Sequence, residues 1–314
     1  MKLVSTARNP IPTGAVTGEV TARDGIRLRF ARWAASAGGR AGTVCLLQGR
    51  TEFIEKYFET VMDLRRRGFA VAALDWRGQG GSQRLLRNPR KGHVDDFADY
   101  EKDLSAFMTD IVLPDCPPPY FALAHSMGGT VMLRAARARD CWFDRVVLCA
   151  PMVGLTGIAV PPGTLAAITT AASYLGLGEM SVPGAKAHAM SQIPFEGNVL
   201  TGDAARFTRN QDILKAAPEL VIEGPTMGWL RAALASMKLI ASPDYPQSVQ
   251  VPALMFAAGG DRVVSSRAIE RLAVQLKTGN QIVLRGSEHE ILQERDDIRS
   301  QFWAAFDAFV PGSR

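Results

Sequence analysis

The feature that most constrains the fold is a repeated alternation of short apolar runs with segments of helical spacing. The runs are apolar at nearly every position, and they lie at 43–47, 69–74, 120–124 and 145–150. Strands buried on both faces have this character, whereas half-buried strands alternate apolar and polar residues. Segments of helical spacing lie between the runs, at 53–67, 95–108 and 127–139. The alternation predicts a mostly parallel β-sheet with helices packed on both faces, which is an α/β fold.

Two further patterns extend this sheet at its ends. Residues 19–23 and 26–30 alternate about an Asp24-Gly25 pair, which is typical of a β-hairpin. After residue 250 the α/β alternation returns. The expected elements there are strands at 252–258 and 281–284 and helices at 265–276 and 296–309.

The alternation stops between residues 152 and 250. This segment is rich in Gly, Pro, Ala, Met and Leu, lacks an apolar run of comparable quality, and holds one good helical pattern at 227–240. A chain of 314 residues with 47% hydrophobic residues can bury a large core and is not disordered. We therefore expect one α/β core, residues 1–151 and 251–314, interrupted after its sixth strand by a mainly helical cap at 152–250.

The charge balance excludes one class of partner. The chain has 36 Lys and Arg against 31 Asp and Glu, but it has no long basic run, and its densest cluster is Arg65-Arg66-Arg67. We therefore expect no nucleic-acid partner. The modest basic excess is compatible with weak contact with an anionic membrane surface.

Cysteine usage and the first residues predict the compartment. Cys45, Cys116, Cys141 and Cys149 have neither C-x-x-C pairing nor metal-ligand spacing, which favours a reducing environment. The first residues lack the apolar core of a signal peptide. The glycine-rich segment 75–82 lacks the third glycine and the lysine of phosphate-binding loops. We expect a cytoplasmic protein, at most peripheral to the inner face of the membrane, with no cofactor and no metal.

Ser126 is the candidate nucleophile. It lies in the run AHSMGG at 124–129, directly after an expected buried strand and directly before an expected helix. A sharp turn between strand and helix lifts a serine hydroxyl above the sheet edge, and small residues on either side let the two elements approach. Ala124 stands where the usual pattern has glycine, a difference of one methyl group.

A serine nucleophile needs a base, and the chain has only four histidines. In this arrangement the order along the chain is Ser, acid, His, which eliminates His93. His125 is adjacent to the serine and suits an orienting or packing role. His188 lies in the expected cap with no strand to position it. His289 follows the last expected strand, where an α/β site forms, and is the candidate base.

The acid should lie between the serine and this histidine. Asp261 follows the expected strand 252–258, and two glycines before it allow a tight loop toward the imidazole. The other aspartates lie at the opposite sheet edge or in the expected cap: Asp140, Asp144, Asp203, Asp212 and Asp244. We expect Asp261 to hold the tautomer of the histidine.

The developing oxyanion needs two main-chain N–H donors. Met127, the residue after the serine, would supply one at a helix N-terminus. The loop 48–52 after the first buried run would supply the other, and we choose Arg50.

These motifs resemble those of α/β-hydrolases of the lysophospholipase and monoacylglycerol lipase type, over most of the chain. The segments that carry the resemblance are 46–52 (LLQGRTE), 74–82 (LDWRGQGGS), 124–129 (AHSMGG), 257–263 (AAGGDRV) and 286–290 (GSEHE). The family's triad would correspond to Ser126, Asp261 and His289, and its oxyanion amides to Arg50 and Met127. The family often has His-Gly where this chain has Gln48-Gly49, but the donor there is main-chain.

The resemblance implies ester hydrolysis through an acyl-enzyme, with a lysophospholipid or a monoacylglycerol as substrate. An apolar cap over a polar triad also suits an acyl chain. Two alternatives stay open: a general carboxylesterase or thioesterase with the same triad, and a ligand-binding protein that keeps the fold without hydrolysis. The sequence leaves the roles of His125 and Glu52 and the oligomeric state undetermined.

Overall fold

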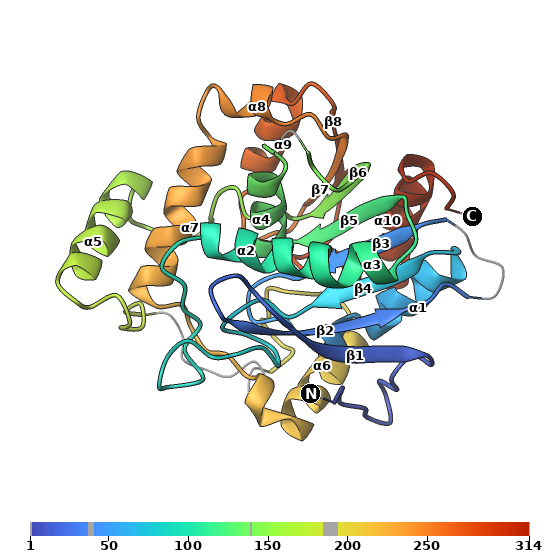
Figure 1. Ribbon diagram of the computed structural model, residues 1–314. Helices are drawn as coiled ribbons and strands as arrows, with labels where there is room; N and C mark the ends of the chain where they lie inside the picture. The colour runs from blue at the N-terminus through green and yellow to red at the C-terminus, as the bar shows by residue number, and fades with distance from the viewer. Residues whose placement is uncertain (1, 37–40, 139, 185–193, 314) are drawn as a thin grey trace.

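The computed structural model describes residues 2–36, 41–138, 140–184 and 194–313. Within these residues the strands form one eight-stranded sheet in the order β1-β2-β4-β3-β5-β6-β7-β8 (Figure 1). The strands are β1 (Ala15–Thr21), β2 (Arg27–Trp33), β3 (Thr43–Leu47), β4 (Ala70–Leu74), β5 (Tyr120–His125), β6 (Arg145–Cys149), β7 (Ala253–Ala258) and β8 (Gly279–Leu284). The pairings of β1 with β2 and of β2 with β4 are antiparallel, and the others are parallel. The expected hairpin and the mostly parallel sheet are confirmed.

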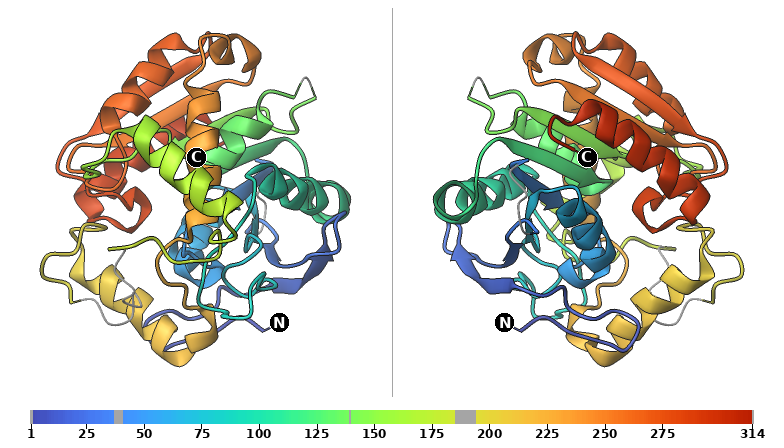
Figure 2. Two further views of the ribbon diagram at one scale, coloured as in Figure 1. Left: turned by 90° about the vertical axis from the view of Figure 1, so that its left-hand side faces the viewer. Right: turned by 90° about the vertical axis from the view of Figure 1, so that its right-hand side faces the viewer.

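Helices cover both faces of this sheet. Helices α1 and α10 lie on one face, where the Arg67 guanidinium just after α1 pairs with Asp307 of α10 at 2.7 Å, and α2, α4 and α9 lie on the other (Figure 2). The helices are η1 (Ile54–Tyr57), α1 (Phe58–Arg66), α2 (Ala98–Phe107), η2 (Met108–Val112), α3 (Leu113–Asp115), α4 (Met127–Ala135), α5 (Pro162–Tyr174), α6 (Ala204–Ala216), η4 (Pro218–Leu220), α7 (Met227–Ile240), α8 (Tyr245–Ser248), α9 (Ser266–Gln275), η5 (Ile291–Gln293) and α10 (Asp296–Phe309).

The topology places the site at the ends of β3 and β5. From β3 the chain crosses to β4 on one side, and β5 then pairs with β3 on the other side. Connections that leave adjacent strands in opposite directions open a crevice at the carboxyl ends of those strands. The loops that follow β3 and β5 therefore meet at one point of the sheet edge.

The helical expectations for the core differ from the structure mainly at element ends. The segment expected at 95–108 begins at Ala98 and continues through η2 and α3, because the side chains of Ile111 and Val112 are buried against the core. The segment expected at 53–67 is divided into η1 and α1. Tertiary contacts determine where these helices begin and end, and the spacing of apolar residues along the chain does not predict those ends.

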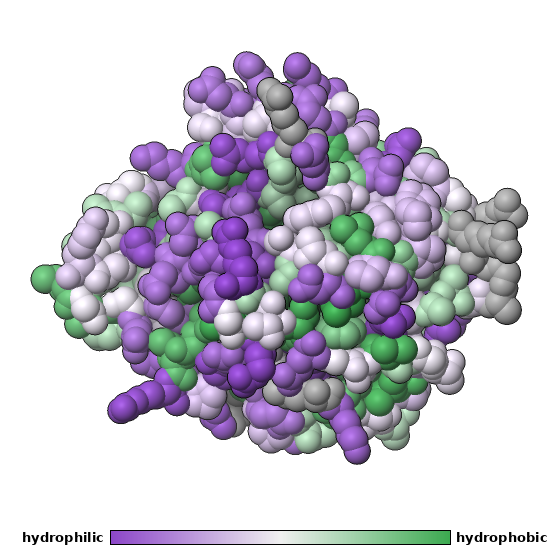
Figure 3. All heavy atoms as spheres, viewed as in Figure 1, coloured by the Kyte–Doolittle hydropathy of each residue, from purple (hydrophilic) through white to green (hydrophobic). Residues whose placement is uncertain are grey.

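The segment between β6 and β7 is mainly helical in its described part. Helix α7 has the bounds that the sequence predicts, and it packs against α4 of the core and against α5. The spacing did not reveal α5 or α6 as separate helices. Helix α5 has no charged residue and buries only Thr169, so its sequence has no amphipathic pattern. It projects from one end of the molecule, which carries mostly pale and green residues (Figures 1 and 3).

The start of α4 lies unusually close to the end of β3. A Cβ atom on Gly128 would overlap the carbonyl oxygen of Leu47, and one on Gly129 would lie 2.8 Å from the Cβ atom of Pro151. Leu47 ends β3 and Pro151 follows the end of β6, so both lie at the edge of the sheet. The two glycines are therefore required by the space between strand and helix, as the sequence pattern predicts.

We predict that Gly128→Ala lowers the free energy of unfolding by about 2–3 kcal/mol, because the added methyl group displaces main chain and not a flexible side chain. Guanidinium chloride unfolding followed by circular dichroism would measure this. Gly163→Ala is the matched control, since a Cβ atom there meets nothing within 4 Å. Equal stability of the two variants would contradict the required contact.

Candidate active site

Ser126 occupies a strained turn between β5 and α4. Its φ of 50° and ψ of −114° lie where L-residues are rarely found. The turn is held by its own main chain: the Ser126 N–H donates to the Cys149 carbonyl at 3.0 Å, and its carbonyl accepts from Thr130 and Met152. This geometry presents the hydroxyl above the sheet edge, as a nucleophile requires.

The structure brings the three predicted residues of the triad together. Nε2 of His289 lies 3.1 Å from Oγ of Ser126, and its Nδ1 lies 2.8 Å from Oδ2 of Asp261. Asp261 follows β7 and His289 follows β8, so three separate strand ends contribute one residue each. The separations along the chain are 28 and 163 residues, which only the parallel sheet brings together.

The carboxylate of Asp261 is well positioned to orient the imidazole. Its other oxygen accepts the N–H groups of Val263 and Val264 at 2.8 and 2.9 Å. Burial alone would raise the pKa of this carboxyl, but the hydrogen bond and charge of His289 and these two N–H groups hold its pKa below the usual value. An ionised Asp261 accepts a hydrogen bond from the Nδ1–H group of His289, which leaves Nε2 unprotonated and facing the serine.

Two main-chain N–H groups at the same edge have no internal acceptor among the described residues. They belong to Met127, the first residue of α4, and to Arg50, in the loop after β3. The loop is shaped by side chains: the Gly49 N–H donates to the Glu52 carboxylate, and the Gly49 carbonyl accepts from Gln79 at 2.8 Å. Free N–H donors at such a position can bind a developing anion.

The other histidines have separate environments. Nδ1 of His93 lies 2.8 Å from Oγ1 of Thr226, between the loop after β4 and the start of α7. His188 lies outside the described residues. His125 contacts Glu52 through Nδ1 at 3.1 Å and the main-chain carbonyl of His289 through Nε2 at 3.2 Å.

Beneath the triad lies a buried network of charged side chains that the sequence did not predict. Glu52 accepts from Tyr57 at 2.6 Å and from the Lys56 ammonium at 2.7 Å, and Lys56 also pairs with Glu290 at 2.6 Å. The side chains of Glu52, Lys56 and Glu290 are each less than a tenth exposed. The network thus joins the loop after β3 to the residue beside His289. Spacing alone could have suggested only the i, i+4 pair of Glu52 and Lys56.

Glu52 and His125 shift each other's titration. Burial disfavours the charged form of each, but their mutual attraction outweighs it, with Lys56 adding to the effect on Glu52. The pKa of Glu52 lies well below its usual value, and the pKa of His125 lies above its usual value. His125 therefore favours its charged form in the folded protein more than in the unfolded chain.

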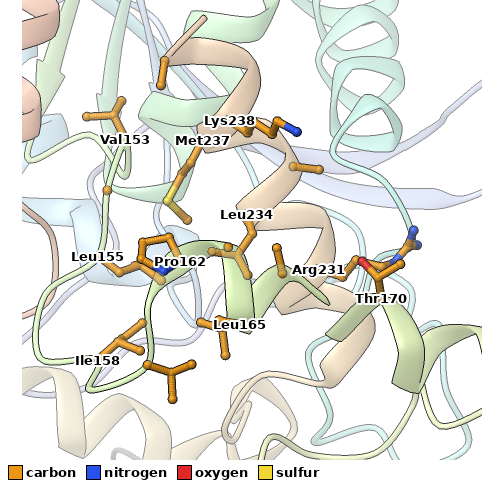
Figure 4. Close-up of a pocket in the computed structure, with 16 residues that line it drawn as sticks. Val153, Leu155, Ile158, Pro162, Leu165, Thr170, Arg231, Leu234, Met237 and Lys238 are labelled. Atoms are coloured by element: carbon orange, nitrogen blue, oxygen red, sulfur yellow. The ribbon is translucent and has the colours of Figure 1, made fainter. Parts of the chain in front are cut away.

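A cavity of about 750 Å³ lies between α5, α7 and the chain after β6, and its lining does not include Ser126, Asp261 or His289 (Figure 4). It is lined mainly by aliphatic side chains, with Arg231 and Lys238 as its cations. Its lining begins at Val153, next to Met152, whose N–H donates to the Ser126 carbonyl at 3.0 Å. In the part of the chain that the structure describes, no group of His, Cys, Asp and Glu side chains is arranged as a metal site.

We predict a pH-dependent contribution of His125 to stability. A raised folded pKa stabilises the native state fully below the unfolded pKa of about 6.5, and this stabilisation is lost as pH rises through the folded value. The loss in unfolding free energy caused by His125→Gln should therefore be greatest near pH 5 and shrink toward pH 9. Glu52 stays ionised throughout this range because its pKa is depressed. Urea unfolding across the range would measure the difference.

Glu52→Gln provides the matched background, since it keeps the shape of the side chain and removes its charge. In that background the effect of His125→Gln should lose most of its pH dependence. A pH profile that is the same in both backgrounds would contradict the coupling.

Comparisons with known proteins identify the family of the chain. The family model described as serine aminopeptidase, S33 (Hydrolase_4), matches residues 38–296. Lysophospholipase L2 of Escherichia coli (strain K12) is 34% identical over 296 residues, which cover 90% of this chain and 83% of that protein. A monoacylglycerol lipase of Mycolicibacterium smegmatis is 25% identical over 276 residues, 86% of this chain and 88% of that one.

Solved structures are similar in fold. A carboxyl esterase from Bacillus coagulans superposes with a TM-score of 0.75 and 19% identity, covering 96% of this chain and 99% of that one. A monoglyceride lipase from Saccharomyces cerevisiae superposes with a TM-score of 0.72 and 17% identity, covering 93% and 94%. With the family model spanning most of the sequence, this chain belongs to the serine aminopeptidase S33 family of α/β-hydrolases, in its lysophospholipase- and monoacylglycerol lipase-like part.

Proposed function

We propose that this protein is a serine hydrolase that cleaves the carboxylic ester bond of single-chain lipids, lysophospholipids or monoacylglycerols. The observation that carries the proposal is the continuous hydrogen-bonded line from Ser126 through His289 to Asp261. The similarity to lysophospholipase L2 and to monoacylglycerol lipases supports the substrate class.

The proposed reaction has two halves. His289 takes the proton of Ser126 as its oxygen attacks the ester carbonyl, and Asp261 stabilises the imidazolium that forms. The imidazolium then protonates the leaving alcohol, which leaves an acyl-enzyme. Water, deprotonated by His289, attacks the acyl group and releases the fatty acid and the free serine.

The main-chain N–H groups of Arg50 and Met127 are the proposed oxyanion donors. Both are without an internal acceptor in the described residues, and both lie at the edge where Ser126 is presented. Such donors stabilise the tetrahedral intermediate more than the flat ester, and each contributes about 3–4 kcal/mol of barrier reduction in comparable enzymes. The side chain at position 50 does not affect this role, because the donor is main-chain.

The apolar cavity supports an acyl chain as the part of the substrate that the protein buries. Its lining includes Leu155, Ile158, Leu165, Leu234 and Met237 (Figure 4). An alkyl chain gains about 0.8 kcal/mol for each methylene group that it buries in such a site. The preference between a long and a short acyl ester should therefore be large.

Residues 152–250 are proposed as a cap over a core formed by residues 1–151 and 251–314. Helices α5, α6 and α7 all lie in this segment, and α7 packs on α4 directly behind the serine turn. Met227, Trp229 and Leu230 are buried, so they form the packed base of the proposed cap. A cap of this kind excludes water from the ester bond.

The outer end of the same segment supports a peripheral contact with a lipid surface. Tyr174 and Leu175 are 87% and 74% exposed, and Ile168, Leu177 and Met180 are also exposed. Large apolar side chains gathered at one exposed site are typical of a binding surface. No helix within the described residues is long and apolar enough to cross a bilayer. A cytoplasmic location stays a prediction from the sequence.

We predict that Ser126→Ala abolishes ester hydrolysis and labelling by a fluorophosphonate probe. Asp261→Asn should lower kcat by about 10⁴-fold, because the amide supports the wrong tautomer of His289. Hydrolysis of 1-acylglycerols and lysophospholipids of increasing chain length would measure both. Full activity of Ser126→Ala would overturn the mechanism.

The same panel separates the alternatives. A preference for acetyl over long acyl esters, or for thioesters, would favour a general carboxylesterase or thioesterase. Absence of hydrolysis and of probe labelling in the wild-type protein would favour a ligand-binding role.

We further predict that Tyr174→Glu with Leu175→Glu weakens sedimentation with phosphatidylglycerol–phosphatidylethanolamine vesicles, because two charges replace apolar side chains at the lipid contact. The control is Val274→Glu with Val283→Glu, which adds the same charge at exposed apolar residues outside the proposed cap. Equal binding by the two double variants would contradict a contact through α5.

A further inference from the structure

The guanidinium of Arg50 is a partly buried cation that pairs with no carboxylate among the described residues. Its Nη2 donates to the main-chain carbonyl of Glu223 at 2.7 Å, and its Cζ lies 5.0 Å from the ring centre of Trp229 on α7. Its Nε is buried and has no hydrogen-bond acceptor among the described residues. A charge-bearing donor with so few acceptors is rare in a folded interior.

Arg29 and Arg77, two arginines that are buried more deeply than Arg50, are paired with acids. Arg29 contacts both Glu55 and Asp75 at 2.6–2.7 Å, and Arg77 contacts Asp24 and Asp103 at 2.6–2.8 Å. In these two arginines, carboxylates compensate the buried charge.

Burial without an acid has an electrostatic consequence for Arg50. Desolvation lowers its pKa to about 10, with only a small opposing contribution from Tyr100. The side chain nevertheless remains a cation at neutral pH. An anion placed against it would recover both the missing charge pair and the missing hydrogen bonds.

The main-chain N–H of Arg50 determines how far its guanidinium lies from the ester of the proposed substrate. The Arg50 N–H is one of the two proposed oxyanion donors, so the side chain begins where the ester carbonyl would sit. In an arginine, a fixed number of covalent bonds connects the main-chain nitrogen to Cζ. The ester carbonyl carbon and the phosphorus of a 1-acyl lysophospholipid are the same number of bonds apart. A phosphate therefore has the reach to contact the guanidinium while the carbonyl oxygen contacts the N–H.

We propose that Arg50 binds the phosphodiester of a lysophospholipid and makes such lipids better substrates than monoacylglycerols of the same acyl chain. This proposal rests on the proposed function and narrows its substrate class. The planar guanidinium suits a phosphate, to which it can donate two parallel hydrogen bonds. A monoacylglycerol offers only a hydroxyl group at the corresponding place.

The test compares Arg50→Met with wild type on two substrates with the same acyl chain, lysophosphatidylglycerol and 1-monoacylglycerol, below their micellar concentrations. Methionine keeps the main-chain donor and an apolar contact with Trp229 and removes the charge. We expect kcat/KM for the lysophospholipid to fall by about 10- to 100-fold, the effect of losing charge-assisted hydrogen bonds. Because Arg50 also supplies a proposed oxyanion donor, the readout is the ratio of the two kcat/KM values, which should shift toward the monoacylglycerol by this factor.

Arg84→Met is the matched control. Arg84 also donates to a main-chain carbonyl of the segment between β6 and β7, that of Glu219 at 2.6 Å, and it also has a buried nitrogen without an acceptor. It lies outside the loop after β3. This variant should leave the ratio of the two kcat/KM values unchanged.

A parallel fall for both substrates in Arg50→Met would show that Arg50 only anchors α7, and it would overturn the proposal. So would an unchanged ratio of the two values. Fluorophosphonate labelling of Ser126 at the wild-type rate shows that the variant has kept its reactive site. These outcomes differ from failure of the proposed function, in which the wild-type protein would cleave neither lipid.

Discussion

The close approach of helix α4 to the end of β3 is the constraint on which the site depends. Only a residue without a Cβ atom fits against the Leu47 carbonyl, and Gly128 occupies that place. The approach forces Ser126 into a positive φ, at a cost of about 1–3 kcal/mol. Its main-chain hydrogen bonds to β6 and to Met152 offset this cost. The same approach brings the first N–H of α4 beside the loop that follows β3.

A single carboxylate then joins the two halves of the site. Glu52 shapes the loop after β3 through the Gly49 N–H, and it contacts His125, which reaches the carbonyl of His289. Lys56 extends the connection to Glu290. Removing one member would leave an uncompensated charge in the interior, so the network acts as a unit. The rigidity of the triad therefore depends on groups that take no part in the proton transfers.

Around this polar centre the protein provides a different environment for each part of a single-chain lipid. An aliphatic cavity lies between α5 and α7, next to the chain that leaves the serine turn. The outer end of α5 exposes large apolar side chains. Arg50 provides the one unmatched cation of the loop after β3. In the proposed complex, these separate environments would favour one orientation of an amphipathic substrate.

The sequence by itself predicted the mostly parallel sheet and the three residues that the structure brings together at its edge, Ser126, Asp261 and His289. Buried strands are apolar at every position, a strand–serine–helix turn needs small neighbours, and the acid and base follow strands whose ends share one edge, so local patterns were sufficient. Only the tertiary structure decided the buried network of Glu52, Lys56 and Glu290, the helices α5 and α6, and the placement of Arg50 away from the described carboxylates. The spacing of charged residues along a sequence does not indicate which residues they will pair with. A helix that buries a single side chain has no amphipathic face from which it could be predicted. Their positions follow from packing between segments far apart in the chain.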